Sequence, residues 1–509
     1  MKIRFYFLLI IVIAINLLGG NAFCLSQKEY YNKVLGAWNG KCIGGGLGMP
    51  VEGWVWTNIM KKYPNVDTYV GYIGESQIGW TNFLVEAEIP KTGNWETIKF
   101  EVIVPDFDTK SGFLSPIVGL SLEGYFNSQD YEIKNARITT PEINLSNENF
   151  YAFIGGWMGD DGIARFHYSP GERAWLKMRY FNKLGIDLKP NDKFALELDA
   201  KWVSGDNKLN LSFDILDRNA KGFGPDDDTS YQIVGLLGVE KYGADITPKQ
   251  IGDLWVKHIG IDLPNYLAEG IALERLRQGI TPPESGNHPV GEAIGGQMKG
   301  EIWGLLCPGR PDLAAEYAYR DGIIAHRDNG VYGEIFVSAM ISHAFVETDV
   351  RKIIEKSLNY IPKDCKYAQI VRGVLSDFDS GKSWRQILKE VKEEYPSMCD
   401  PVYPEAAIIT IALIEGKGDF ENTIKYAFYC GSDTDCNTAT VGAVIGTIIG
   451  FDNIPKKWSD PIGNVFKCFA VGNENWKITE LAEKICKNGN AVMKFHGKSN
   501  NFSEIYYKK

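Results

Sequence analysis

The spacing of hydrophobic residues changes twice along this 509-residue chain, near Pro64 and again near Asp226. Between these points, apolar and polar residues alternate in short runs, which Gly, Pro, Asn and Asp separate. Examples are TIKFEVIVP, KFALELDAKWV and LNLSFDILD. This alternation is typical of antiparallel strands, whereas the flanking segments have the period of helices. We therefore predict an antiparallel, jelly-roll-like β-sandwich over residues 64–220, inserted into an all-α domain formed by residues 26–63 and 221–509.

The first helical segment is rich in small residues. The stretch SQKEYYNKVLGAWNGKCIGGGLGMPVEGW has helical spacing at Tyr30, Val34 and Trp38 and then many glycines. We expect a helix whose small residues allow close approach to another backbone, ending in a Gly-rich turn that presents Glu52. Because one helix cannot bury its apolar face alone, the two helical parts are expected to pack together.

The N-terminus has the layout of a secretory signal. Lys2 and Arg4 precede an apolar run, which small and polar residues follow. We predict a signal peptide over residues 1–25, a secreted or periplasmic protein, and no stable membrane span after cleavage. An uncleaved anchor is the alternative, although the apolar run is short for a span. The net charge of -10, without a basic run, argues against a nucleic-acid partner.

Two acidic motifs precede apolar, Gly/Ala-rich segments with helical spacing. One is GFGPDDDTSYQIVGLLG, with Asp226, Asp227 and Asp228, and the other is GSDTDCNTATVGAVIG, with Asp433 and Asp435. Taken singly, each motif suits a helix start, where carboxylates accept free N–H groups. Three consecutive aspartates nevertheless exceed what one cap needs.

If the two helix starts meet, five carboxylates share a small volume, and neither motif contains a basic residue. Like charges at short range repel strongly, and protonation or bound cations are the remedies. Oxygen ligands without histidine suit Mg²⁺, Mn²⁺ or Ca²⁺. We therefore predict that the two motifs share a pair of divalent ions.

The order of five motifs resembles the ADP-ribosylglycohydrolase family, which includes the dinitrogenase-reductase-activating glycohydrolases. The motifs are GMPVEGW, DDDT, IGGQMKGEIWG, AHRDNGVYGE and GSDTDCNTATVGAVIG, and the variant resembles a large bacterial branch of that family. The resemblance covers residues 28–56 and 222–479. It implies two Mg²⁺ or Mn²⁺ ions as cofactors. The ligands that it implies are Asp226, Asp227, Asp228, Asp433, Asp435 and Cys436.

This sequence departs from the family pattern at two of these positions. Asp226 and Cys436 stand where the family usually has threonine. A thiol is a poor ligand for Mg²⁺, and the extra carboxylate is a candidate compensation.

The resemblance also implies catalytic and substrate-binding residues. Glu52 matches a glutamate that acts beside the metals on the water or the leaving group. The segment around IGGQMKG stands where relatives hold ribose and phosphate, and AHRDNGVYGE is placed like a substrate-side loop. The implied substrate-binding residues are Gly296, Gln297, Met298, His326, Asn329 and Tyr332. The plainer alternatives are an exposed Glu52 and a structural His326.

The resemblance predicts metal-dependent hydrolysis of a ribosyl bond in a sugar or ADP-ribosylated substrate. Two alternatives stay open: a secreted glycosidase acting on a furanoside or polysaccharide, and a non-catalytic carbohydrate-binding protein in which Ca²⁺ organises loops. A carbohydrate ligand of the inserted strands is also open, because they contain several aromatic residues. These are Trp80, Trp157, Trp175 and Trp202.

Overall fold

The structure is a computed structural model that describes most of the chain. The described residues are 25–70, 77–78, 85–103, 117–124, 129–139, 144–145, 150–153, 156–158, 163–168, 175–178, 193–216, 222–259, 267–395 and 401–497. The predicted signal peptide, apart from residue 25, and Trp80 lie outside these residues. Within them, no helix is both long and apolar enough to span a membrane.

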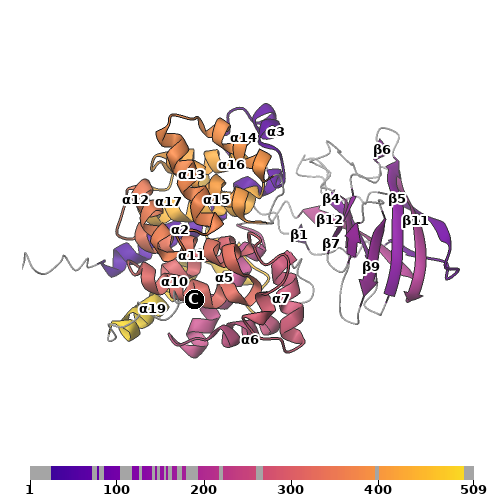
Figure 1. Cartoon of the computed structure of the whole chain (residues 1–509), viewed down its shortest axis with the longest axis horizontal. Coiled ribbons are helices and arrows are strands. Elements are labelled where there is room, and N and C mark those ends of the chain that lie inside the picture. The colour runs from indigo at the N-terminus through magenta and orange to yellow at the C-terminus, as the bar shows by residue number, and fades with distance from the viewer. Residues whose placement is uncertain are drawn as a thin grey trace, which may run out of the picture.

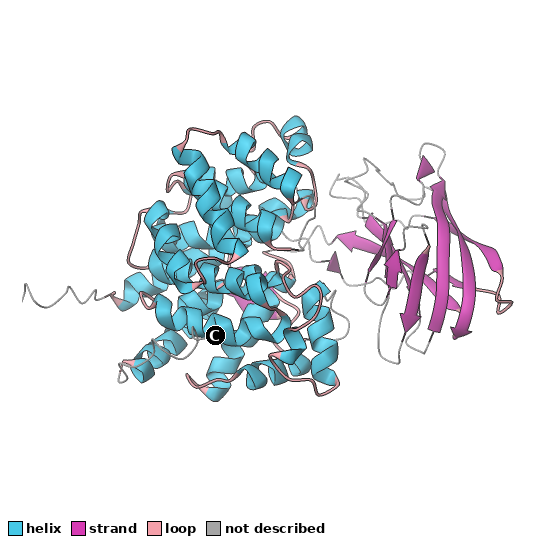
Figure 2. Ribbon diagram, in the orientation of Figure 1, coloured by secondary structure: helices cyan, strands magenta, loops and turns pink. Residues whose placement is uncertain are grey.

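Helices dominate the two ends of the described chain (Figure 2). Before the strands come α2 (Gln27–Gly48), η1 (Met49–Val51) and α3 (Trp56–Lys62). After the strands come α5 (Asp227–Tyr242), α6 (Pro248–His258), α7 (Leu267–Arg277), η4 (Glu284–Gly286), α8 (Gly295–Lys299), α9 (Glu301–Leu306), α10 (Pro311–Ala325), α11 (Asp328–Ala344), α12 (Val350–Ser357), η5 (Leu358–Tyr360), α13 (Lys366–Asp379), α14 (Trp384–Glu394), α15 (Tyr403–Gly416), α16 (Phe420–Cys430), α17 (Thr434–Ile449), η6 (Phe451–Asn453), α18 (Lys456–Ile462) and α19 (Ile478–His496). A short hairpin of β13 (Val465–Lys467) and β14 (Asn475–Lys477) precedes α19.

The described strands between the helical parts form two antiparallel sheets, which lie to one side of the helices (Figure 1). The first sheet has the order β1 (Gln77–Ile78), β12 (Lys208–Leu216), β4 (Ile117–Gly124), β10 (Trp175–Met178) and β7 (Phe150–Phe153), with β2 (Val85–Glu88) paired to β12. The second has the order β3 (Trp95–Ile103), β11 (Lys193–Gly205), β5 (Gln129–Thr139), β9 (Ala164–Tyr168) and β8 (Gly156–Met158), with β6 (Asn144–Leu145) paired to β5. The prediction of antiparallel strands is confirmed, and the boundaries of the insert stay a prediction.

Strand β11 shows why this region folds as sheet. Its alternate residues Leu196, Leu198 and Ala200 are buried, and the side chains between them are partly exposed. A period of two places such residues on opposite faces. Trp202 follows on the same face as these buried residues but is partly exposed, and its indole N–H donates to the Gly205 carbonyl oxygen. The Nζ atom of Lys91 lies 5.7 Å from the centre of the Trp202 ring, so this aromatic is not a bare platform for a sugar.

Helices α2 and α17 pack at unusually short range in the middle of the helical part. A methyl group on Gly40 would lie 2.0 Å from the carbonyl oxygen of Gly442, and one on Gly44 would lie 2.1 Å from that of Thr438. Gly36 and Gly48, one turn further out at each end, make the same kind of contact. Glycines at every fourth position therefore form a stripe along which the two backbones touch.

This packing confirms the expected close approach of the first helix to another backbone, and it corrects the expected position of the Gly-rich turn. Helix α2 continues through the glycines and ends at Gly48. A glycine inside a helix costs about 0.5–1 kcal/mol relative to alanine. Close contact with α17, which a larger side chain would prevent, offsets this cost. Since α2 ends beside the start of α17, Glu52 and the second acidic motif become neighbours.

Candidate metal centre

The first acidic motif forms the start of α5. Asp226 is the N-cap residue, and its carboxylate accepts a hydrogen bond from the backbone N–H of Asp228 at 2.6 Å. The capping role considered for this motif is therefore real for Asp226. Asp227 and Asp228 follow in the first turn, and ligand atoms of the three carboxylates lie within 4.8 Å of one another.

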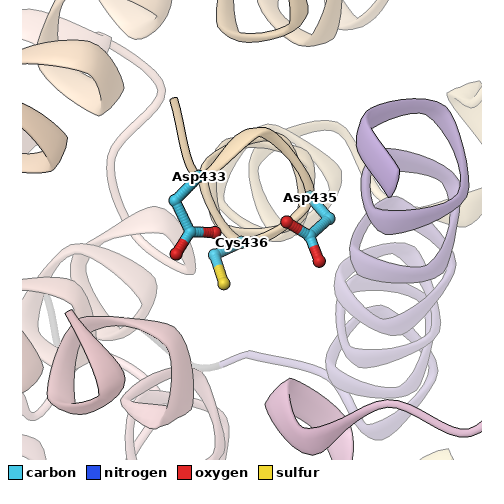
Figure 3. Close-up of side chains that lie close together, drawn as sticks. All are labelled: Asp433, Asp435 and Cys436. Atoms are coloured by element: carbon cyan, nitrogen blue, oxygen red, sulfur yellow. The ribbon is translucent and has the colours of Figure 1, made fainter. Parts of the chain in front are cut away.

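The second acidic motif forms the start of α17. Asp433 is at the N-cap position without capping the helix through its side chain. Figure 3 shows that Cys436 lies between the carboxylates of Asp433 and Asp435. Ligand atoms of these three residues also lie within 4.8 Å of one another. Two positive-φ residues, Gly431 at 68° and Ser432 at 71°, turn the chain into this helix.

The two helix starts meet. The thiol of Cys436 donates a hydrogen bond to Asp228 Oδ1 at 3.2 Å, which joins α17 to α5. Glu52 lies close enough to the cluster that, after burial, its negative charge contributes to the raised pKa of Asp433, Asp435 and Asp228. We call Asp226, Asp227, Asp228, Asp433 and Asp435 the acidic cluster.

Burial and mutual repulsion dominate the electrostatics of the acidic cluster. Removal from water, and then Glu52 and Asp433, raise the pKa of Asp435 well above its usual range. Burial, followed by the charges of Glu405 and Glu52, raises the pKa of Asp433 to about 7. Carboxylates shifted in this direction are destabilised in their charged form, and a nearby cation would relieve the destabilisation.

The residues present fit divalent cations. Both groups of ligand atoms consist of carboxylates apart from the Cys436 thiol, as hard cations require. The Oδ1 atom of Asp435 is buried and has no hydrogen-bond partner among the described residues. An unsatisfied carboxylate oxygen in a cluster of like charges is the expected state of a ligand oxygen.

The sequence profile of the ADP-ribosylglycohydrolase family matches residues 197–492, which include both acidic motifs. The chain belongs to this family. Members of the family are glycosidase-type hydrolases, so this chain is one too. A solved structure described as an ADP-ribosylglycohydrolase-related protein complex is similar at 18% identity, over 54% of this chain and 85% of that one, with a TM-score of 0.37. No curated protein sequence matches the chain significantly.

Helix α2 and Glu52 lie outside residues 197–492, the part of the chain that matches the ADP-ribosylglycohydrolase family. Helix α2 nevertheless contributes a cation to the acidic cluster. Lys41 Nζ is 3.6 Å from Asp228 Oδ2 and 3.2 Å from Glu301 Oε1. Burial alone would lower the pKa of Lys41, but Glu301 and Asp228 raise it above its ordinary value. Neither acidic motif contains a basic residue, and the cation beside the cluster comes instead from a distant helix.

Two buried glutamates were also missed by the sequence analysis. Glu301 accepts hydrogen bonds from Lys41 and Thr440, and Glu405 accepts them from Asn437 at 2.5 Å and from Ser432 at 2.7 Å. Glu405 thereby holds the turn that leads into the acidic cluster. The available signal was a charged residue on an otherwise apolar helix, as in PEAAIITIALIEG.

The predicted ribose-binding segment forms the buried helix α8. The amide of Gln297 donates to Asn437 Oδ1 at 3.3 Å and accepts from the Tyr367 hydroxyl at 2.7 Å. Met298 offers its carbonyl oxygen to Lys41 at 3.0 Å. A methyl group on Gly296 would lie 2.3 Å from a carbonyl oxygen of α11. These residues connect helices beside the acidic cluster, and their contact with substrate stays a prediction.

The predicted substrate-side loop is likewise held by protein contacts. His326 is buried, and its Nε2 atom lies 2.8 Å from Glu269 Oε1, which supports the structural alternative for this histidine. Asn329 donates to Glu292 Oε2 at 2.7 Å and accepts from the backbone N–H of Tyr367 at 2.9 Å. Tyr332 is partly buried against the core. Substrate contacts of His326, Asn329 and Tyr332 stay predictions.

We expect the Cys436 thiol to act as a hydrogen-bond donor to Asp228. Cys436→Ser retains a donor and should keep kcat/KM within about threefold of the wild type, whereas Cys436→Ala should lower kcat/KM by about tenfold, because a hydrogen bond to a charged group contributes about 1.5 kcal/mol or more. Steady-state kinetics in Mg²⁺ would distinguish the two variants. Equal losses in both would show that the sulfur atom itself is needed.

Proposed function

We propose that the protein is a metal-dependent glycohydrolase that cleaves a ribosyl, ADP-ribosyl-like glycosidic bond. Two Mg²⁺ or Mn²⁺ ions would be held by the carboxylates of the acidic cluster. The observation that carries the proposal is the contact of the α5 and α17 starts through Asp228 and Cys436, which brings the five aspartates of the acidic cluster together. Divalent ions bound there would supply Lewis acidity and charge neutralisation to the reaction.

In this proposal, Glu52 is the general acid or base that transfers a proton during hydrolysis. It follows η1 and is partly exposed, and backbone hydrogen bonds between Gly53 and Ser432 at 2.7 Å and between Ser432 and Trp54 at 3.1 Å hold its loop against the acidic cluster. An Oε atom of Glu52 would accept the proton of the attacking water or donate one to the leaving group. The surrounding carboxylates would stabilise positive charge that develops on the sugar ring.

Glu52→Gln is expected to lower kcat by about 100-fold at saturating Mn²⁺, since the amide cannot exchange the proton. Because this variant also loses a negative charge beside the acidic cluster, it should bind Mn²⁺ about tenfold more weakly. Single-turnover kinetics and Mn²⁺ titration would measure the two effects. Glu96→Gln, on strand β3, is the matched control and should change neither. Unchanged turnover in Glu52→Gln would remove Glu52 from the mechanism.

We also propose that the protein is exported and that its inserted strands form a jelly-roll-like sandwich. The charged, apolar and small-residue regions of the N-terminus support export, and the two antiparallel sheets between the helical parts support the sandwich. Substrates outside the cell would then include ribosylated proteins and free furanosides.

A substrate panel tests the proposed function. The purified protein would be incubated with ADP-ribosyl-arginine, ADP-ribose and aryl furanosides in Mg²⁺ or Mn²⁺, with matched samples in excess EDTA. We expect hydrolysis of at least one ribosyl compound, loss of activity in EDTA, and its return on adding Mn²⁺. Full activity after complete removal of metal would refute the metal-dependent mechanism.

A further inference from the structure

Lys41 occupies the interior side of the acidic cluster. Its side chain is 2% exposed, and Nζ donates to the Met298 carbonyl oxygen at 3.0 Å and to Glu301 Oε1 at 3.2 Å. The same Nζ atom lies 3.6 Å from Asp228 Oδ2. A buried ammonium group with these partners cannot extend to the solvent, so its position is fixed by the surrounding helices.

Glu301 anchors this lysine. Its Oε1 atom also accepts a hydrogen bond from Thr440 at 2.9 Å, and its Oε2 atom accepts one from Gln232 at 2.9 Å. Lys41, Gln232 and Thr440 belong to α2, α5 and α17, so Glu301 connects the three helices that form the cluster. These contacts fix the position of the Lys41–Glu301 pair on the interior side of Asp228.

The two sides of the cluster therefore differ in charge. Asp228 has a protein partner at each oxygen, the Cys436 thiol at Oδ1 and the Lys41 ammonium at Oδ2. Asp435, by contrast, has a buried Oδ1 atom without a hydrogen-bond partner among the described residues. The fold compensates negative charge at Asp228 and leaves it uncompensated at Asp435.

We propose that Lys41 is a positioning residue that acts as a permanent cation of the acidic cluster, and that the Lys41–Glu301 pair sets how strongly the cluster attracts divalent ions. This inference rests on the proposed function, because it concerns the same ions. Lys41 acts through Asp228 and weakens ion binding by repulsion. Glu301 counters this repulsion by neutralising most of the lysine's charge.

The test is the affinity for Mn²⁺, measured from the EPR signal of free Mn²⁺ without substrate. Lys41→Met removes the repelling charge and should bind Mn²⁺ about tenfold more tightly, since one charge a few ångströms away has an effect of at least this size in a protein interior. Glu301→Gln leaves Lys41 uncompensated and should bind about tenfold more weakly. The double variant Lys41→Met/Glu301→Gln restores the charge balance and should lie within about threefold of the wild type.

The expected changes in Mn²⁺ affinity have opposite signs in Lys41→Met and Glu301→Gln. Structural damage, by contrast, would weaken Mn²⁺ binding in every variant. Circular dichroism would verify that each variant is folded, and if Lys41→Met does not fold, Glu301→Gln and the double variant still test the order of affinities. Weaker binding in all variants, or no change in any, would overturn the inference while the proposed function stands. Absence of Mn²⁺ binding in the wild type would overturn both.

Discussion

Asp435→Asn is expected to reduce kcat/KM by about 1,000-fold or more without unfolding the protein. Loss of a carboxylate from a metal site removes several kcal/mol of transition-state stabilisation, and about 4 kcal/mol corresponds to this factor. Because burial and then the neighbouring carboxylates raise the pKa of Asp435, removing its charge should also relieve desolvation and repulsion in the metal-free protein. The melting temperature in EDTA should therefore stay equal or rise.

Thermal melting with and without Mn²⁺ gives an independent measure of this effect. A ligand at about 100 times its Kd stabilises a protein by about 2.7 kcal/mol, so Mn²⁺ should raise the melting temperature of the wild type. The Asp435→Asn variant should lose most of this rise. Asp460→Asn, an exposed aspartate on α18, makes the same change in charge and should behave as the wild type. Wild-type turnover in Asp435→Asn would contradict the assignment of this residue.

Gly44→Ala is expected to destabilise the protein by about 3 kcal/mol or more, because the added methyl group would lie 2.1 Å from the Thr438 carbonyl oxygen. The backbones of α2 and α17 would have to separate, since no flexible side chain can yield. A loss of this size corresponds to a decrease in melting temperature of about 4–5 °C for a helical domain of more than roughly 300 residues. Differential scanning calorimetry would measure it.

The matched control for Gly44→Ala is Gly373→Ala. Gly373 is exposed within α13, and a methyl group there would meet no heavy atom within 4 Å. Alanine should stabilise this helix by about 0.5–1 kcal/mol. A similar decrease in melting temperature for both variants would contradict the close packing of α2 on α17. Because α2 also packs at Gly48 against Thr434 and Asp435 in the first turn of α17, Gly44→Ala should also displace Asp435 and weaken Mn²⁺ binding.

The sequence predicted several features from local pattern. Alternation between positions 64 and 220 indicated antiparallel strands because side chains in a strand point alternately to its two faces. Consecutive aspartates before apolar helices indicated that the starts of α5 and α17 were more than ordinary caps. The contact of Cys436 with Asp228 agrees with this interpretation.

Other features depended on which helices became neighbours. The glycines after Trp38 were expected in a turn, and contact with α17 keeps them helical as far as Gly48. Gln297 and His326 resembled substrate-binding residues by position, and the structure gives both of them buried protein partners. Their local sequence contains no information about those partners.

By itself, the sequence determined the types of secondary structure and the two acidic motifs, because periodicity and composition are local properties. The tertiary structure alone decided the charge balance of the site. It brought Lys41 and Glu301, which are 260 residues apart, into contact beneath Asp228. Coulombic interactions depend on distance in space, and for residues on different helices that distance is set by the packing of the whole fold.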